Sequence, residues 1–396
     1  MARALEDVMV IDLTQALAGP FCTQQLALMG ANVIRIEPPW GGYGTAVFSG
    51  FEMDIRRRLF GTCFANKKNT TLDLRSEKGK ELFLRLVEKG DIVVQNFSPG
   101  VMEKLGLDYE VLKKTNPRII YCAISGYGQT GPWKNKVAYD MFVQASTGFM
   151  SMNGYADGAP LRVGVPISDL LGGLYAAIGI LVALHARNNV TGEGQMIDCA
   201  MFDATISLLQ EAASLSLFRG ESVPRTGNRH PFGAPSDTFE SKDNKPEYIG
   251  TQTDGQWKAL MSLIDPQDVE RKEWGVLDRL KHGDEIDALV RTWARTKTRE
   301  EIEELLSSHD IPCAPVLNII EVSQHPHTKA REMFVDADDM FGTITGLIGV
   351  APKLLGTPGG IDWGIMERGA FNEEVYAGLL GLNEEEMDDL KENHII

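Results

Sequence analysis

The first half of the chain alternates short apolar runs with amphipathic stretches. Residues 8–13 have the pattern of a strand, residues 21–29 have that of a helix closed by Gly30, and residues 32–37 have that of a second strand. A strand, a helix and a second strand of this size make a βαβ unit, whose two strands lie parallel. The opening residues therefore predict the start of a parallel sheet.

The same alternation continues to residue 124. Ser76 is suited to begin a helix as its N-cap, and Gly90 is suited to end it. The later predicted elements are strands at 70–74, 92–95 and 118–124 and helices at 78–89 and 101–115. Strands and helices that alternate in this way favour an α/β fold with a doubly wound, Rossmann-like sheet.

The longest uncharged apolar stretch, residues 170–186, lies between Asp169 and Arg187 and contains three glycines and a histidine. It is shorter than the ~20 residues that a membrane span needs. We expect a helix buried inside the protein. After residue 213 the composition changes, and a stretch rich in Gly, Pro, Arg and Ser indicates a long connection before a smaller segment of mixed strands and helices.

Composition and charge exclude several classes of protein. The chain has 396 residues, and 39 basic against 55 acidic side chains give a net charge of -16. Such an acidic chain is not typical of nucleic-acid binding or of an anionic membrane surface. Its five cysteines form no C-x-x-C pair, so no zinc or redox motif is visible, and we expect no metal. No apolar run follows the N-terminus, which favours a cytoplasmic location.

Two sequence patterns suggest phosphate binding, and both have simpler explanations. Residues 126–131 spell G-x-G-x-x-G, but Pro132 and Trp133 follow where a dinucleotide site needs a helix, so a close-packed turn is favoured. Basic residues gather at 56–58 and 67–68, with Arg75 and Lys104 further on. They suit either a solvated face or a phosphorylated cofactor, and the pattern alone leaves both open.

Asp169 is the acid with the most interesting position. It precedes the apolar helix, where it is a plausible N-cap, and that structural role would suffice to explain it. A carboxylate at a helix N-terminus is also held ionised, and it could attack a thioester carbonyl while Gly172 and Gly173 let a substrate approach. The local sequence does not separate the two roles.

A longer set of motifs resembles the class III CoA-transferases, the family of formyl-CoA, carnitine and bile-acid CoA-transferases. The similarity runs nearly end to end. Its carriers include VIDLTQALAGPFCTQQLALMGANVIRIE, NKKNTTLDLRSEKGKELFLRLVEKGDIVVQNFSPGVMEKLG, SGYGQTGPW, VPISDLLGGLYAAIGILVALHAR, TGEGQMIDCAMFDA and IPCAPV.

The resemblance implies that Asp169 is the catalytic nucleophile, which forms an acyl-aspartyl anhydride and then an aspartyl-CoA thioester. Acyl-CoA and a carboxylic acid are the implied substrates, with no permanently bound cofactor. The residues that match the family's CoA contacts are Leu72, Arg75, Asn96, Phe97, Ser98, Lys104, Ala138 and Tyr139.

The resemblance also implies the domain organisation. It gives a large CoA-binding domain over residues 1–220, a linker and a smaller α+β domain over 221–325, and a C-terminal segment, 326–396, that returns to the large domain. Two chains are expected to interlock as a homodimer, or the chain pairs with a paralogous subunit.

Departures from the family pattern bear on the substrate. Leu17 and Pro38 stand where oxalate-specific members carry glutamine and arginine, so we expect an acceptor acid larger than oxalate. Two alternatives remain open. One is an α-methylacyl-CoA racemase, although Tyr139 occupies the position of that enzyme's histidine base. The other is a role as the active subunit of a heteromeric transferase.

Overall fold

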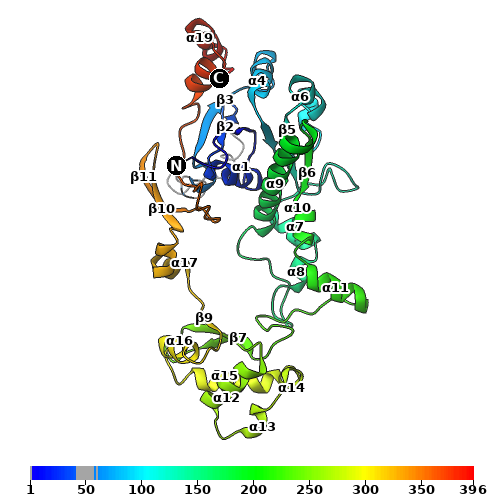
Figure 1. The fold of residues 1–396 in the computed structure, drawn as a ribbon. Coiled ribbons are helices and arrows are strands. Elements are labelled where there is room, and N and C mark those ends of the chain that lie inside the picture. Colours follow the sequence, from blue (N-terminus) through cyan, green and yellow to red (C-terminus); the bar gives the residue numbers. More distant parts are fainter. Residues whose placement is uncertain (1, 42–57, 59–60) are drawn as a thin grey trace. The chain divides into compact units, whose positions relative to one another are not determined.

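The computed structural model describes residues 2–41, 58 and 61–396, and the description below is confined to them. The chain forms two compact units (Figure 1). The first combines Met1–Phe149, Arg162–Ala213 and Pro326–Ile396, and the second combines Met150–Leu161 and Ser214–His325.

The first unit is built on a six-stranded parallel sheet in the order β3-β2-β1-β4-β5-β6. This is the order of a doubly wound sheet: β2 and β3 are added on one side of β1, and β4, β5 and β6 on the other. The strands are β1 (Met9–Asp12), β2 (Asn32–Glu37), β3 (Lys67–Thr71), β4 (Ile92–Gln95), β5 (Ile120–Ser125) and β6 (Met196–Ala200). The predicted α/β class with a parallel sheet is confirmed.

One strand lies elsewhere than predicted. The expected strand at 70–74 is instead β3, which pairs with β2 from Val33 beside Lys67 to Glu37 beside Thr71. Its sequence KKNTT is polar, and a polar stretch is not typical of a buried strand. The prediction failed because the side chain of Lys67 is buried and satisfied by hydrogen bonds rather than by apolar contacts.

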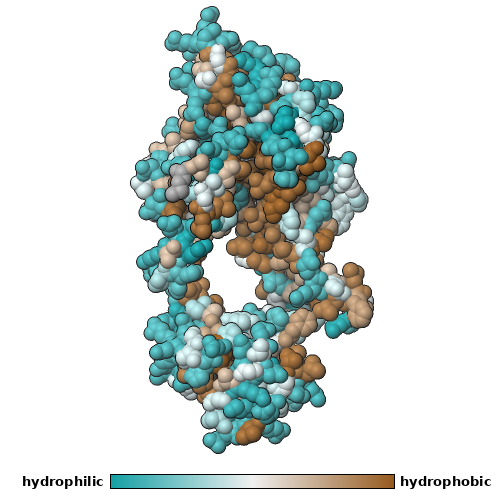
Figure 2. All heavy atoms as spheres, viewed as in Figure 1, coloured by the Kyte–Doolittle hydropathy of each residue, from teal (hydrophilic) through white to brown (hydrophobic). Residues whose placement is uncertain are grey.

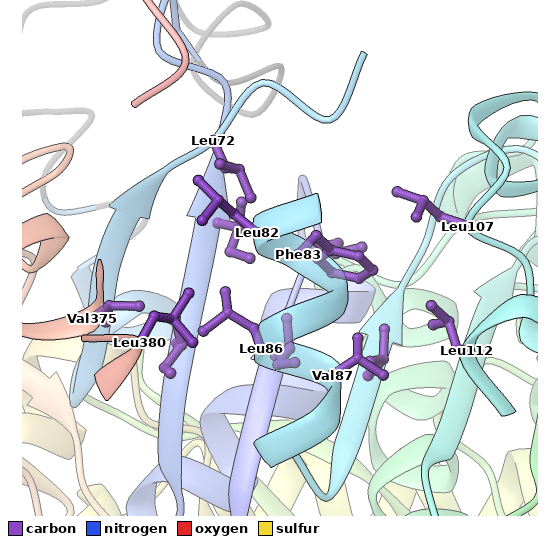
Figure 3. Packing of buried hydrophobic residues seen from close by; sticks show 14 of the residues in the cluster. Leu72, Leu82, Phe83, Leu86, Val87, Leu107, Leu112, Val375 and Leu380 are labelled. Carbon is purple, nitrogen blue, oxygen red and sulfur yellow. The ribbon is translucent and has the colours of Figure 1, made fainter. Parts of the chain in front are cut away.

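Helices cover both faces of the sheet. One face carries α4 (Glu77–Lys89), whose Ser76 accepts a hydrogen bond from Gly79 N at 3.0 Å and so confirms the predicted N-cap. Figure 3 shows Leu82, Phe83, Leu86 and Val87 of α4 packed on the sheet, with Val375 and Leu380 of the C-terminal segment beside them. The further helices on this face are α5 (Val101–Leu105) and α6 (Tyr109–Thr115).

The opposite face carries α1 (Ala18–Leu28) and α9 (Ile167–Ala186). Ala176, Ile180 and Ala183 of α9 are buried against the sheet. The other side of α9 is apolar and exposed, and Figure 2 shows hydrophobic side chains gathered over it. The expectation of a fully buried helix is therefore wrong for one face. By length and composition Ile167–Thr191 could cross a membrane, and 44% of its most apolar window is buried in the protein.

The first unit is completed by shorter elements. They are α7 (Asp140–Ser146), η1 (Arg187–Thr191), α10 (Met201–Ile206), α18 (Pro326–Ala330), β10 (Phe334–Asp339), β11 (Gly342–Ile348), η2 (Glu373–Leu379) and α19 (Glu384–Glu392). The hairpin of β10 and β11 had no counterpart in the sequence prediction. The C-terminal segment is fastened to the sheet by Tyr376, whose hydroxyl donates to the Thr71 carbonyl oxygen at 2.7 Å.

The second unit is α+β, with an antiparallel sheet in the order β7-β8-β9. Its strands are β7 (Ser236–Glu240), β8 (Pro246–Gly250) and β9 (Cys313–Pro315), and its helices are α12 (Asp254–Ile264), α13 (Val269–Lys272), α14 (Val276–Lys281), α15 (Gly283–Ala294), α16 (Arg299–Ser307) and α17 (Ile319–Gln324). Thr253 and Thr298 form capping boxes for α12 and α16. Two helices, α8 (Phe149–Met152) and α11 (Gln210–Arg219), lie at the unit boundaries.

Candidate active site

A cavity of about 430 Å³ opens at the carboxyl edge of the parallel sheet. It is lined by residues that directly follow four strands, among them Leu13 after β1, Pro38 after β2, Leu72 after β3 and Asn96 after β4. The gap between β1 and β4 is the point at which doubly wound sheets bind ligands. Fold topology thus identifies this cavity as a candidate binding site.

The cavity gathers most of the residues matched to CoA contacts. Leu72, Arg75, Asn96, Phe97 and Ser98 all line it, although they come from two separate segments of the chain. Lys104 is exposed on α5, next to the lining residue Leu105. Ala138 and Tyr139 do not line this cavity.

Asn96 also fixes the loop that forms one wall. Its Nδ2 donates to the Gln15 carbonyl oxygen at 2.7 Å, and its Oδ1 accepts from the Gln15 backbone N–H at 2.8 Å. The next residue, Ala16, has a φ of 58°, a left-handed conformation that a residue with a Cβ rarely adopts. The paired hydrogen bonds from Asn96 hold the loop in this turn.

The cations at the cavity differ in how freely they can reach a ligand. Arg35 is buried and forms an ion pair with Glu37. Burial alone would raise the pKa of Glu37, but the ion pair with Arg35 opposes burial, and the pKa of Glu37 is lowered. Arg75 is exposed; its guanidinium lies 3.9 Å from the centre of the Trp40 ring and 3.2 Å from Asp73 Oδ1. Of the predicted basic cluster at 56–58, residues 56 and 57 lie outside the described residues.

Ala138 and Tyr139 lie together beside the G-x-G-x-x-G turn. A Cβ on Gly126 would come within 2.0 Å of the Ala138 Cβ, so only glycine allows this approach. Gly128 and Gly131 have φ values of 87° and 83°, and no helix follows them, as expected for a turn rather than a dinucleotide site. Tyr139 precedes α7 and its side chain is 58% exposed.

Asp169 lies in the first turn of α9 but is not its N-cap. The N-cap is Pro166, which offers no side-chain hydrogen bond, and the backbone N–H of Ser168 donates to Asp140 Oδ1 at 2.8 Å. The predicted capping role of Asp169 is therefore wrong. The cap comes from α7, whose first residue is Asp140.

The electrostatic surroundings of Asp169 also differ from the expectation. Burial, followed by the charge of Asp140, raises the pKa of Asp169 to about 7. A helix N-terminus alone would lower it. Desolvation and a like charge outweigh the helix dipole, so the pKa of Asp169 is shifted in the direction opposite to the one expected. Among the described residues, no hydrogen bond donor reaches its carboxylate.

Leu17, expected to bear on the choice of acceptor acid, lies in apolar surroundings. Leu17 is half-buried and contacts a small apolar cluster with Cys63, Phe64 and Ile365. It does not line the cavity described above. Two further residues of the site, Trp40 and Gln15, were missed because their roles depend on neighbours remote in sequence.

Comparisons with known proteins agree with the motif resemblance. The family model for CoA-transferase family III matches residues 5–365. Succinyl-CoA–D-citramalate CoA-transferase from Chloroflexus aurantiacus is 33% identical over 401 residues, which cover 100% of this chain and 98% of that protein. Acetyl-CoA:oxalate CoA-transferase from Acetobacter aceti is 38% identical over 338 residues, or 83% and 85% of the two chains.

A solved structure shares the fold over nearly the whole length. The crystal structure of a CAIB/BAIF family protein from Brucella suis matches with a TM-score of 0.85 and 32% identity. The match covers 96% of this chain and 100% of that one.

Proposed function

Because the chain belongs to CoA-transferase family III and is a CoA-transferase, we propose that it moves CoA from an acyl-CoA thioester to an acceptor carboxylate through covalent intermediates on Asp169. One observation carries this proposal. Asp169 presents a partly desolvated carboxylate, with a pKa raised to about 7, that is not used to cap its own helix. Such a group is a stronger base, and a better nucleophile, than an exposed aspartate.

The reaction proceeds by exchange of thioester and anhydride. An Asp169 oxygen attacks the acyl carbonyl carbon, the C–S bond breaks, and the electron pair leaves with the CoA thiolate. The thiolate then attacks the Asp169 carbonyl carbon, which releases the donor acid and leaves an aspartyl-CoA thioester. The acceptor carboxylate then attacks the aspartyl-CoA thioester and releases the CoA thiolate, which leaves an anhydride between the acceptor and Asp169. The thiolate attacks the acceptor's carbonyl carbon in this anhydride, which forms the new acyl-CoA and frees Asp169. Exclusion of water protects the anhydride between the steps.

The CoA moiety is proposed to bind in the cavity at the carboxyl edge of the sheet. Leu72 and Phe97 offer apolar contact there, while Asn96 and Ser98 offer polar groups. Arg75 and Lys104 are suited to the phosphates because guanidinium and ammonium groups bind phosphate oxygens strongly. Ala138 and Tyr139 are proposed as contacts closer to Asp169, since Tyr139 directly precedes Asp140.

The acceptor is proposed to be an organic acid larger than oxalate. Leu17 and its contacts with Cys63 and Phe64 would form an apolar wall, which does not suit a small dianion. The named relatives act on both kinds of acid, citramalate and oxalate. A panel of acceptor acids tests the proposal, and a marked preference for oxalate contradicts it.

We also propose a cytoplasmic dimer. The exposed face of α9 carries Leu174, Tyr175, Ile178, Leu181 and Val182, and a contiguous apolar surface of this kind is typical of a subunit interface. A second copy of the chain, or a paralogous subunit, would cover it. The described cysteines are unpaired thiols, as the cytoplasm favours.

Trapping of the intermediate tests the mechanism. The purified protein is mixed with succinyl-, acetyl-, butyryl- or aryl-CoA and hydroxylamine, and the mass of the peptide that contains Asp169 is measured. Conversion of Asp169 to a hydroxamate is expected with at least one donor, together with loss of turnover in Asp169→Asn. A fully active Asp169→Asn variant would refute the proposal. Exchange of the substrate α-proton for deuterium would instead indicate a racemase.

A further inference from the structure

Helix α9 begins without a capping side chain of its own. The first backbone N–H groups of a helix lack partners within the helix, and Pro166 at the N-cap cannot supply one. Asp140 supplies it from α7, since its Oδ1 accepts the Ser168 N–H at 2.8 Å. The two residues are 28 positions apart in sequence. The turn that carries Asp169 is therefore anchored by a carboxylate from another helix.

Asp140 is itself held in place by buried partners. It is 6% exposed, and its Oδ2 accepts a hydrogen bond from Gln144 Nε2 at 2.6 Å. The Gln144 Oε1 accepts from the backbone N–H of Val163 at 3.0 Å. These contacts join α7 to the segment that leads into α9, and a fully satisfied buried network of this kind is rigid.

Ser168 is fixed on a second side. It is buried, and its Oγ accepts a hydrogen bond from Thr205 Oγ1 of α10 at 2.9 Å. The residue directly before Asp169 is thus tied to α7 through its backbone and to α10 through its side chain. Only the link to α7 brings a charge.

We propose that Asp140 is a positioning residue for Asp169: it caps α9 from α7, holds the turn that carries Asp169, and leaves the Asp169 carboxylate free for chemistry. The negative charge of Asp140 also contributes to the raised pKa of Asp169. The inference rests on the proposed function of Asp169. It goes further by assigning a second carboxylate that acts without touching the substrate.

Other ionisable groups on α9 and on the elements packed against it do not take the same role. They include Tyr139 before α7, Tyr175 on α9, Asp203 on α10, Cys22 on α1 and Cys199 on β6. Burial raises the pKa of Cys199 to about 12, and it raises that of Cys22 further, so both remain neutral thiols. Within the described part of the chain, Asp140 is the charged group that acts on Asp169.

Asp140→Asn removes the negative charge of residue 140 but keeps a side-chain oxygen that can cap α9. The asparagine oxygen still accepts from Ser168 N–H, but the negative charge and the hydrogen bond that Oδ2 accepts from Gln144 are both lost. The acid limb of the pH profile of kcat/KM is expected to move to lower pH by about one unit. The plateau rate is expected to fall about threefold, because nucleophilicity declines as basicity declines. Asp140→Glu, which restores the charge, is expected to return the limb toward its original pH.

Thr205→Val is the matched control. It perturbs Ser168 in the same turn without removing a charge, so it is expected to leave the position of the acid limb unchanged. An acid limb in Asp140→Asn that overlays the wild-type limb, or an equal shift in Thr205→Val, overturns the inference.

Asp140→Ser provides a second measurement if Asp140→Asn does not fold, because a serine hydroxyl can cap α9 without carrying a charge. The acid limb is expected to move to lower pH as in Asp140→Asn, and a limb that overlays the wild-type limb overturns the inference. Hydroxylamine labelling of Asp169 in the wild-type chain is measured in parallel. Absence of labelling at every pH, with Asp169→Asn active, refutes the proposed function instead, so the two failures are distinguishable.

Discussion

At the scale of single residues, Arg75 shows how an exposed cation is kept at the cavity. Its guanidinium stacks on Trp40 and contacts Asp73, yet most of the side chain is exposed to solvent. A planar cation with free donors at the mouth of the cavity is suited to bind a phosphate. Trp40 orients it without neutralising its charge.

We predict that Arg75→Ala raises the KM for acyl-CoA by about tenfold or more, as loss of a charge-assisted hydrogen bond would, while kcat changes little. Steady-state kinetics over a range of acyl-CoA concentrations measure both constants. Lys78→Ala is the matched control, because Lys78 is an exposed cation of α4 that contacts Glu81 and does not line the cavity. An unchanged KM in Arg75→Ala would show that Arg75 does not bind the phosphates.

Single residues also show which features of the site could be predicted from the sequence and which could not. Asp169 could be proposed because its motif is contiguous, and the N-cap Ser76 could be predicted because an N-cap and its partner are three residues apart. The cap of α9 could not be found, since its donor and acceptor are 28 residues apart and meet only in the fold. For the same reason the raised pKa of Asp169, which depends on burial and on Asp140, was expected in the wrong direction.

At the scale of secondary structure elements, a buried ion pair joins β1, β3 and α1. Lys67 Nζ donates to Asp12 Oδ2 at 3.0 Å, to Thr23 Oγ1 at 2.7 Å and to the Pro20 carbonyl oxygen at 2.9 Å. Burial opposes the charge on Asp12, but Lys67 and the hydroxyls of Thr14 and Thr23 outweigh it, so the pKa of Asp12 is lowered. All three ammonium protons are satisfied at the base of the loop that forms the cavity wall.

We predict that Lys67→Met lowers the free energy of unfolding by about 3–5 kcal/mol, because it leaves the Asp12 carboxylate buried without its countercharge. Denaturant titration measures the loss. Lys68→Met is the matched control: it lies on the same strand and pairs with Glu374 near the surface, where a pair contributes at most about 1 kcal/mol. Equal losses in the two variants would contradict this account.

Strands were predicted correctly where apolar residues determine the strand. The strands at 32–37 and 92–95 were predicted with the bounds that the structure has. The prediction failed at β3, where a lysine and two threonines face buried polar partners. The prediction of a buried helix also failed on the exposed face of α9. An apolar helix face has the same composition whether residues of its own chain or of another chain cover it.

At the scale of the whole molecule, the second unit contains a buried acid that links stability to pH. Glu247 lies on β8 with no exposed surface, and neither carboxylate oxygen accepts a hydrogen bond from a nitrogen or oxygen donor in the described residues. Burial, and then the charge of Glu303, raises its pKa to about 7. The folded unit therefore holds this proton more tightly than the unfolded chain.

Because the pKa of Glu247 is raised on folding, its contribution to stability is complete at low pH and is lost as pH rises from about 4.3 to about 7. We predict that Glu247→Gln stabilises the second unit at pH 8 by up to about 3 kcal/mol relative to the wild type, and that the gain disappears near pH 4. Hydrogen exchange of peptides from β8 and β9 locates the effect. Glu304→Gln, at an exposed position on α16, should show no such dependence.

Charged substitutions on the apolar face of α9 test the proposed dimer. Ile178 and Val182 are 54% and 62% exposed in the single chain and lie one turn apart on α9. If a second copy covers them, Ile178→Glu with Val182→Glu places two like charges in an apolar interface, and the assembly should dissociate at micromolar concentration. Light scattering after size-exclusion chromatography measures the mass. Val269→Glu, at a 68% exposed position on α13, should leave the mass unchanged. A wild-type chain that is monomeric at every concentration would refute the dimer, and the exposed face of α9 would then require a different partner.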